Sequence, residues 1–440
     1  MDQIRRIEEM EAVYDAARAA LLDLEGALEK YLAIAPRLRE LEKYYTSGQW
    51  LRDYQDDEAG KLPRDLKRGV LSQDGVYDLL HLEKWILQVL SDEYTPKGES
   101  KGGYMMERWT QERAQRWWDG QPWPLGINYV TSDAVNDVEM WMDATFHPAL
   151  IEKELGMARG IGYRSVRVFL PYIVWQQERE IFETNFEKFL QLADAAGLSV
   201  MPILFDDCAF DQGMDPAYGP QLPPVPGVHN SRWVPSPGAA LQDAEGAFVS
   251  LQEYVEAIIG PHRQDERILL WDLYNEPGNG GRGVKCLPLL TAVFEWARAL
   301  DPIQPLTAGL WAYSEDMEAV NAFQLAASDV ISLHAYLPLE ETRKLVEQMQ
   351  AQGRPIMITE WLHRPSGNTV ATHVPYFRQE KIGAWQWGMI MGRTQTHLSW
   401  DTMHGTPNAS PTQWQHDILW PDGTPYDAEE IRVIGEAMKD

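Results

Sequence analysis

The chain has 440 residues, of which 44% are hydrophobic, 24% charged and 11% aromatic, so it can bury large cores and is not a disordered protein. Its 39 basic and 66 acidic residues give a formal net charge of −27, which argues against nucleic acid and anionic membranes as partners, because both select clustered Lys and Arg. The two cysteines, Cys208 and Cys286, cannot build a disulfide framework, and no Cys/His cluster indicates structural zinc.

The start of the chain shows no targeting signal. It has no apolar run ahead of a small-residue cleavage site, and no stretch of about 18 uninterrupted apolar residues occurs in the sequence. We therefore expect a cytoplasmic protein that does not span a membrane.

Residues 1–90 predict a small all-α domain. Apolar residues recur at three- and four-residue spacing from Ile4 to Leu32, which is typical of an amphipathic helix. Pro36 can begin a second helix that ends at Ser47, and after a polar stretch a further helical run covers residues 76–90. The acidic side chains lie among Lys and Arg, as on solvated helix faces, so we expect no catalytic residue here. The helices are a candidate contact surface for a homo-oligomer.

The run YYTSGQWLRDYQDDEAGKLPRDLKRGVLSQDGVYDLL resembles a small bacterial helical domain of unknown function, family 4298. The resemblance covers nearly all of residues 1–90, and it implies no activity. Residues 91–103 are polar and rich in glycine, which is typical of a linker.

Residues 104–440 alternate short apolar runs with amphipathic helical segments, several of which end in glycine. This alternation predicts an α/β domain, a (β/α)8 TIM barrel preceded by the all-α domain. A doubly wound sheet is the alternative, but no glycine-rich phosphate loop follows the first run. The predicted strands are Leu125–Tyr129, Ser165–Leu170, Ser199–Phe205, Ile268–Tyr274, Leu306–Leu310, Val330–His334, Pro355–Thr359 and Gly383–Gly388.

A long connection rich in Pro and Gly separates Phe205 from the helix that begins near Gly246. It follows the C-terminal end of a strand, where barrels place their active sites, so we interpret it as an ordered wall of a cleft. His229 and Trp233 are its candidate contacts. A solvated surface insertion is the alternative.

Two glutamates stand at the ends of predicted strands. Glu276 follows the fourth strand in WDLYNEPGN, and Glu360 ends the seventh in PIMITEWLHRP. Three βα units separate them, so both carboxylates should face the barrel mouth from opposite sides. Two facing carboxylates are what cleavage of a glycosidic bond needs, although either glutamate alone would be read as a salt-bridged strand end.

This combination resembles the clan A glycoside hydrolases, particularly the cellulase-like family 5 and its relatives. The resemblance covers the chain from about Trp109 to the C-terminus. It implies that Glu276 is the acid/base, that Glu360 is the nucleophile, and that Asn275 binds the 2-hydroxyl of the substrate.

The same resemblance implies roles for side chains on other strands. Arg167 lies near the nucleophile, and His334 and Tyr336 belong to the sixth strand, with the tyrosine hydrogen-bonded to the nucleophile. We expect Arg167 to keep Glu360 ionised, and burial to raise the pKa of Glu276 so that it stays protonated. The tryptophan that floors the sugar subsite corresponds to Trp387.

Eighteen tryptophans are many for this length, and indole faces stack well on sugar rings. Amide and carboxylate side chains at strand ends can bind sugar hydroxyls. The further candidates are Trp311, Trp361, Trp400, Trp233, Asn128, Asp206, Asp207 and His229.

The sequence therefore favours a retaining β-glycoside hydrolase that acts on oligosaccharides or β-glycosides by double displacement, with no metal and no organic cofactor. A carbohydrate-binding barrel without catalysis is one alternative. A metal-dependent barrel hydrolase is the other, but the first strand, LGINYVTS, contributes no histidine. The sequence leaves the sugar, the linkage and the choice of exo or endo action open.

Overall fold

The computed structural model describes residues 108–439, except 211–214 and 245, and residues 30–79 with gaps. The chain divides into two compact units, residues 1–102 and 103–440. Most of the first predicted helix, the run at 76–90 and the linker lie outside the described residues. None of the described helices combines the length and the apolar character that crossing a membrane requires.

In the N-terminal unit the described residues pack around Trp50, which is 2% exposed. A helix over residues 33–41 precedes α2 (Gly48–Glu58), and the hydroxyl of Ser47 caps α2 by accepting hydrogen bonds from its first amides. The Trp50 indole donates to the carbonyl of Val70 (2.8 Å). Ser47, where the sequence predicts the end of a helix, therefore also precedes the start of α2 as its N-cap. The polar stretch that follows begins inside α2.

The second unit is the predicted (β/α)8 barrel, with eight parallel strands in the order β5-β4-β3-β2-β1-β8-β7-β6. A bridge between Leu310 and Leu333 joins the two edges of the sheet and nearly closes the barrel. All eight predicted strands are present, with ends shifted by a few residues. They are β1 (Leu125–Asn128), β2 (Ser165–Phe169), β3 (Ser199–Asp206), β4 (Trp271–Asn275), β5 (Leu306–Thr307), β6 (Ile331–His334), β7 (Ile356–Trp361) and β8 (Gly383–Trp387).

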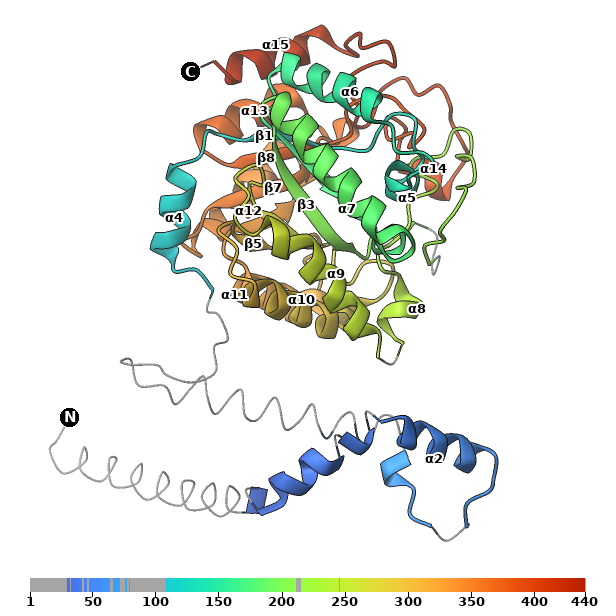
Figure 1. The fold of residues 1–440 in the computed structure, drawn as a ribbon. Helices are drawn as coiled ribbons and strands as arrows, with labels where there is room; N and C mark the ends of the chain where they lie inside the picture. Colours follow the sequence, from blue (N-terminus) through green and yellow to red (C-terminus); the bar gives the residue numbers. More distant parts are fainter. Residues whose placement is uncertain are drawn as a thin grey trace, which may run out of the picture. The chain divides into compact units, whose positions relative to one another are not determined.

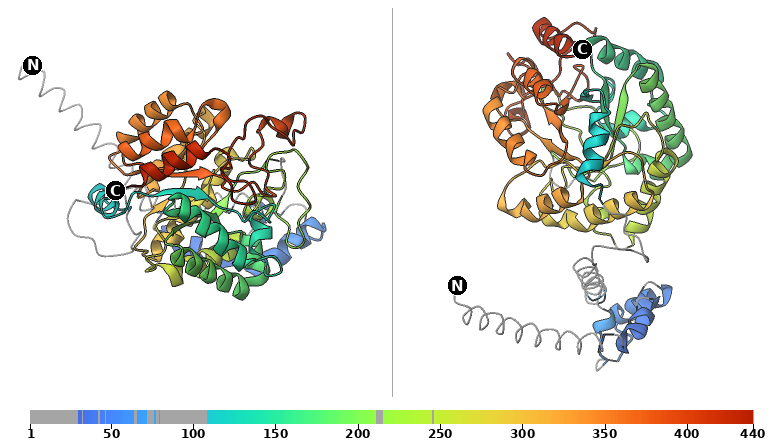
Figure 2. Two further views of the ribbon diagram at one scale, coloured as in Figure 1. Left: turned by 90° about the horizontal axis from the view of Figure 1, so that it is seen from above. Right: turned by 90° about the vertical axis from the view of Figure 1, so that its left-hand side faces the viewer.

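Helices surround the strands and form the outer ring of the barrel (Figure 2, right). The sequence did not predict α4, which lies across the end of the barrel where the strands begin (Figures 1 and 2). The helices are α4 (Gln111–Asp119), α5 (Asp137–Trp141), α6 (Pro148–Ile161), α7 (Tyr172–Ala195), α8 (Ala239–Gln242), α9 (Ala247–His262), α10 (Leu287–Ala299), α11 (Glu318–Ala327), α12 (Leu339–Gln350), α13 (Val370–Gln379), α14 (Asp401–His404) and α15 (Ala428–Ala437).

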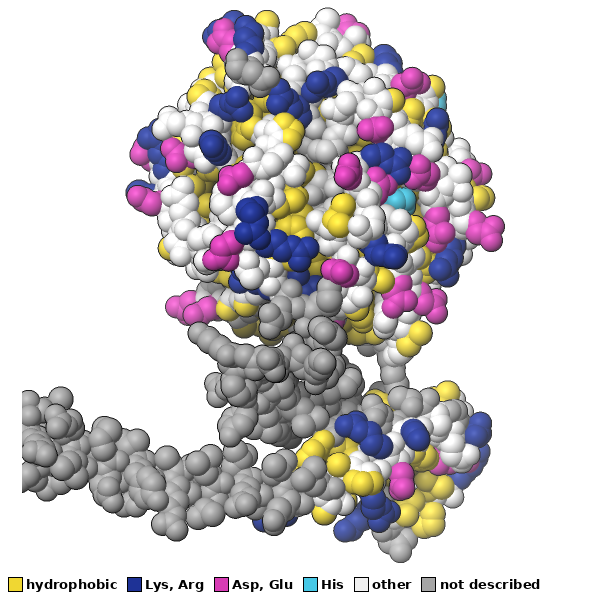
Figure 3. All heavy atoms as spheres, turned by 60° about the vertical axis from the view of Figure 1, so that its left-hand side comes forward, with side chains coloured by type: hydrophobic (Ala, Val, Ile, Leu, Met, Phe, Trp, Pro, Cys, Tyr) yellow, Lys and Arg dark blue, Asp and Glu magenta, His cyan; other side chains and the backbone are white. Residues whose placement is uncertain are grey.

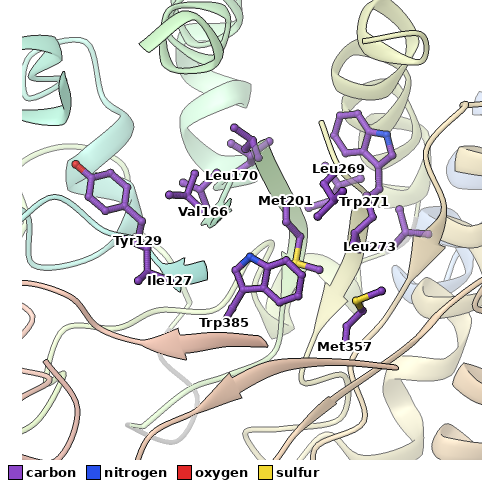
Figure 4. Close-up of a cluster of buried hydrophobic side chains, with 14 of the residues drawn as sticks. Ile127, Tyr129, Val166, Leu170, Met201, Leu269, Trp271, Leu273, Met357 and Trp385 are labelled. Carbon is purple, nitrogen blue, oxygen red and sulfur yellow. The ribbon is translucent and has the colours of Figure 1, made fainter. Parts of the chain in front are cut away.

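The barrel interior is filled by side chains and is not a channel. Met201, Met357 and Trp385 point toward one another from three strands (Figure 4), and each is fully buried. The Trp385 indole fits because β1 has Gly126 beside it: a Cβ atom there would lie 2.3 Å from Trp385 Cδ1. This packed layer is the floor beneath the barrel mouth.

Acidic and basic side chains are interspersed over the face of the barrel that Figure 3 displays. The excess of acids therefore does not form one negative field on this face.

Gly126→Ala should destabilise the barrel. The added methyl group would also lie 2.6 Å from the carbonyl oxygen of Ser165, so both backbone and indole would have to move. Such overpacking lowers the free energy of unfolding by about 1–3 kcal/mol, measurable by denaturant unfolding.

Gly156→Ala in α6 is the matched control, because a Cβ there meets nothing within 4 Å. It should raise stability by roughly 0.5–1 kcal/mol through the lower entropy of the unfolded chain. Equal effects of the two substitutions would contradict the packing described for Trp385.

Candidate active site

The two predicted glutamates lie at the mouth of the barrel, each at an irregular point of its strand. Glu276 directly follows β4 and has φ 43°, in the left-handed region that non-glycine residues rarely adopt. Glu360 lies in β7, where the register with both neighbouring strands shifts. Such irregularities re-aim side chains, and strained backbone of this kind is concentrated at functional sites.

Arg167 on β2 lies at the centre of the site and is fully buried. Its Nε and Nη2 donate to Asp272 Oδ2 (2.9 and 2.7 Å), and Nη1 donates to Glu360 Oε1 (2.9 Å). Nη1 and Nη2 also reach the side-chain oxygens of Asn128 and Asn275, both at 2.6 Å. Since a guanidinium has five N–H groups, this set leaves none of them unpaired.

The sequence reasoning missed Asp272, which is fully buried and shares the guanidinium with Glu360. A usable signal was present, because Asp272 is a charged residue inside the apolar run ILLWDLY. A buried carboxylate needs a cation, and Arg167 interrupts the apolar run SVRVFL in the same way.

His334 stands between the two glutamates. Its Nδ1 lies 2.8 Å from Glu276 Oε1 and 3.4 Å from Glu360 Oε2, and since carboxylates only accept, we assign the proton to Nδ1. The Tyr336 hydroxyl donates to Glu360 Oε2 (2.7 Å). One ligand atom from each of Glu276, His334 and Glu360 lies within 4.8 Å of the others, so the structure brings the two carboxylates and this predicted pair together.

The protonation of the two glutamates differs from the sequence expectation. Burial raises the pKa of Glu360, and the neighbouring Glu276 adds to this, while His334 and Arg167 oppose it. Burial also acts to raise the pKa of Glu276, but the hydrogen bonds that His334 and Asn279 donate outweigh it and leave this pKa lowered. Of the two carboxyls, Glu360 therefore holds a proton more readily, because His334 lies closer to Glu276.

The same three ligand atoms are close enough for a metal ion, so the metal-dependent alternative can be tested. Arg167 contacts Glu360 at 2.9 Å and is itself held on Asp272. A divalent cation bound by Glu360 would lie beside the Arg167 guanidinium, which its ion pair with Asp272 holds in place. The repulsion between these two positive charges, a few ångströms apart in a buried site, would be large. The residues present do not fit a metal.

Above the carboxylates lies a small aromatic cavity of about 50 Å³. Trp387 meets Trp233 edge-on with 5.4 Å between ring centroids, and it meets Phe169 at 5.7 Å. Of the predicted residues, the cavity is lined by Asn275, Glu276, Tyr336, Glu360, Trp387, Trp400, His229 and Trp233. Sequence reasoning missed the lining residues Phe169, Cys208, Phe210 and His416, which no motif marks.

Three polar residues predicted to bind sugar hydroxyls instead hold the framework. Asn128, Asp206 and Asp207 do not line the cavity. The Asn128 amide donates to the carbonyls of Thr359, Trp385 and Gln386. Asp206 accepts from Asn275, Trp233 and the Cys208 amide, and Asp207 accepts from Tyr274, Gln242 and the Gly278 amide. Their oxygens are engaged within the protein, so these predictions are corrected.

Two predicted sugar platforms also lie elsewhere. Trp361 is fully buried and packs against His373 and Phe377 of α13, on the helix side of β7. Successive residues of a strand face opposite sides, so the neighbour of Glu360 could not join it in the mouth. Trp311 is half-buried and donates its indole N–H to the carbonyl of Pro277 (3.0 Å), which supports the loop after Glu276.

Comparison with known proteins adds one sequence match. Residues 7–91 match the family model "Domain of unknown function (DUF4298)", as the sequence indicated. No curated protein matches the chain.

The barrel is similar to solved structures of glycoside hydrolases. A GH5_18 protein from Streptomyces cattleya, solved with Manb1-4GlcNAc, has 15% identity and a TM-score of 0.51, covering 72% of this chain and 80% of its own. The exo-beta-1,4-mannosidase Op5Man5 from Opitutaceae bacterium strain TAV5 has 15% identity and a TM-score of 0.50, covering 72% and 60%. A GH5_18 protein from Bifidobacterium longum has 12% identity and a TM-score of 0.50, covering 72% and 78%. These similarities confirm the fold.

Asp272→Asn should destabilise the protein, because the fully buried Arg167 would lose a negative charge that compensates its own. Breaking a buried ion pair typically lowers the free energy of unfolding by about 3–5 kcal/mol. Thermal or denaturant unfolding measures this change.

Asp243→Asn makes the same substitution in another Asp–Arg pair, with Arg282, in which the aspartate side chain is 59% exposed. Exposed pairs contribute about 0–1 kcal/mol, so this control should unfold almost as the unaltered protein does. If Asp272→Asn also left the free energy of unfolding almost unchanged, the burial of Arg167 would not depend on the charge of Asp272.

Proposed function

We propose that the protein is a retaining β-glycoside hydrolase, which cleaves O-glycosidic bonds of oligosaccharides or β-glycosides with Glu360 as the nucleophile and Glu276 as the acid/base. It needs no metal or organic cofactor. The proposal rests on the two carboxylates of the barrel mouth and on the groups that hold them.

The observation that supports it most is the spacing of the carboxylates. Oxygens of Glu276 and Glu360 lie within 4.8 Å of each other. Retaining enzymes place their carboxyl groups about 5–5.5 Å apart, whereas an inverting enzyme needs roughly 6.5–9.5 Å to admit a water molecule between carboxylate and sugar.

In the first step the Glu360 carboxylate attacks the anomeric carbon while Glu276 gives its proton to the departing oxygen. A covalent glycosyl ester of Glu360 forms and the aglycone leaves as an alcohol. In the second step Glu276 takes a proton from water, the water oxygen attacks the anomeric carbon, and Glu360 is released. Arg167 and Tyr336 contact Glu360 at 2.9 and 2.7 Å and favour its ionised form, which the first step requires.

The substrate must move the proton from Glu360 to Glu276 before the first step. The two carboxyls titrate as a pair, so the reactive arrangement is one of two ways to place a single proton. A glycosidic oxygen beside Glu276 accepts a hydrogen bond only from the protonated form, and binding it therefore favours that arrangement.

The aromatic cavity supports a sugar ring as the ligand, because Trp387 and Trp233 offer indole faces and edges at the carboxylates. All three similar structures involve mannose by name: the Streptomyces cattleya and Bifidobacterium longum proteins were solved with Manb1-4GlcNAc, and the Opitutaceae protein is an exo-mannosidase. We therefore place β-mannosides first among the substrates to be tested.

Glu360→Ala should lower the hydrolysis of aryl β-glycosides by several orders of magnitude, because no group remains to attack. Added azide should restore turnover by entering the vacated space and should yield the α-glycosyl azide, identified by NMR. Glu253→Ala, on an exposed face of α9, is the control and should leave activity unchanged.

Glu276→Ala separates the two roles. It should slow the cleavage of substrates with poor leaving groups roughly 10²–10⁴-fold, but it should spare the first step with dinitrophenyl glycosides, which need no proton. Azide products of the same anomeric configuration from both variants would contradict the assignment of the two glutamates.

The pH dependence of kcat/KM should be bell-shaped, since both the doubly protonated and the doubly ionised pair are inactive. His334 lowers the pKa of both glutamates, so His334→Ala should raise both and move the two limbs of the bell to higher pH. His147→Ala, an exposed surface histidine, should not move them. An unshifted bell in a folded His334 variant would show that His334 does not set these pKa values.

A further inference from the structure

The described parts of the long loop after β3 (residues 207–210 and 215–238) and the loop after β8 (residues 388–420) lie beyond the strand ends, and the two loops meet there, as Figure 1 shows. We call their hydrogen-bonded junction the loop seam. Its bonds run from His229 N to Thr402 Oγ1 (2.9 Å), Asn230 N to Thr394 O (2.9 Å), Gly227 N to Gln395 Oε1 (3.1 Å) and Asn408 N to Gly227 O (2.8 Å).

The connection after β1, which includes α5, also contacts both loops. Asn136 donates to the carbonyl of Arg232 in the β3 loop (2.8 Å), and Arg393 of the β8 loop forms an ion pair with Glu139 (2.8 Å). In the sheet β1 and β2 lie between β8 and β3. The three loops therefore close the mouth of the barrel over β1 and β2.

The other side of the mouth carries shorter connections. Only residues 335–338 separate β6 from α12. Glu276 lies at the end of β4, and the acid must contact the glycosidic oxygen, so the leaving group extends toward β4, β5 and β6. The sugar that forms the bond to Glu360 lies on the opposite side, against the seam.

On the seam side the aromatic cavity is bounded by the β3 loop. Trp233 and His229, both on the β3 loop and both almost fully buried, are part of its wall.

His229, which lines the cavity, has one unpaired polar atom. Its Nδ1 lies 2.8 Å from the carbonyl of Leu398, which can only accept, so Nδ1 carries the proton. Burial lowers the pKa of His229 to about 4, and the ring is therefore neutral near pH 7. The buried Nε2 has no partner in the structure and can accept a hydrogen bond from a hydroxyl group.

We propose that the loop seam blocks the glycone side of the site, so that the protein removes single sugars from non-reducing chain ends, with His229 Nε2 accepting a hydrogen bond from a hydroxyl of that terminal sugar. This inference rests on the proposed glycosidase function. It adds the mode of action and a specificity residue.

The first test follows the products of β-1,4-linked mannohexaose and cellohexaose that carry a fluorescent label at the reducing end. The labelled product should shorten by one sugar at a time, with the pentasaccharide appearing first. Early labelled di- or trisaccharides would overturn exo action while leaving the glycosidase function intact. No cleavage of these oligosaccharides or of aryl β-glycosides would overturn the function itself, and this inference with it.

The second test addresses His229. His229→Asn keeps a donor near Leu398 but removes the unpaired Nε2 acceptor, and it should lower kcat/KM about tenfold, as the loss of one hydrogen bond of about 1.4 kcal/mol does. His229→Gln places an oxygen near the Nε2 position and should recover part of the loss.

Aryl β-glycosides that lack single hydroxyl groups distinguish contact from a structural effect. With the unaltered protein, removal of one particular hydroxyl group from the substrate should lower kcat/KM about tenfold. With His229→Asn, removal of the same hydroxyl group should lower kcat/KM hardly at all, because the same hydrogen bond cannot be lost twice. If every deoxy substrate loses the same factor with both proteins, His229 does not bind the sugar.

Discussion

The site depends on one buried cation. A guanidinium at zero exposure is tolerated only if every N–H finds an acceptor, and Arg167 finds its acceptors on three other strands. Asn128 comes from β1, Asp272 and Asn275 come from β4, and Glu360 comes from β7. Because these side chains share one charge, the position of Glu360, the proposed nucleophile, is fixed by the barrel itself and not by a loop, which gives it the rigidity that the proposed catalysis needs.

Glu276, the proposed acid/base, is held by different means. Glu276 sits on a backbone in the left-handed region, and the loop after it is tied to Asp207 through the Gly278 amide (2.8 Å) and to Trp311 through the Pro277 carbonyl. Asp207 is also bonded to Tyr274 and is nearly fully buried. The strained residue is thus surrounded by contacts that keep it in place, as strain in a folded protein requires.

Much of this could be predicted from the sequence. Parallel barrel strands are buried on both faces and read as apolar runs, which located all eight strands, and a polar residue at the end of such a run marked both Glu276 and Glu360. The framework roles of Asn128 and Asp206 could not be predicted from their positions at strand ends. A sugar-binding amide or carboxylate and a framework one have the same chemistry, and only the partners brought close by folding, here Arg167 and Trp233, separate them.

Under the proposed activity, the loop seam also governs how products leave. With the β1–β2 side closed, the sugar bound at Glu360 and the leaving chain share one opening on the β4–β6 side. The shortened chain must therefore dissociate before the released monosaccharide can escape behind it, and a chain cannot thread forward for a second cut. Under the proposed activity this makes the hydrolase distributive, with one bond broken per encounter, and lets free monosaccharide compete for the same pocket as the next chain end.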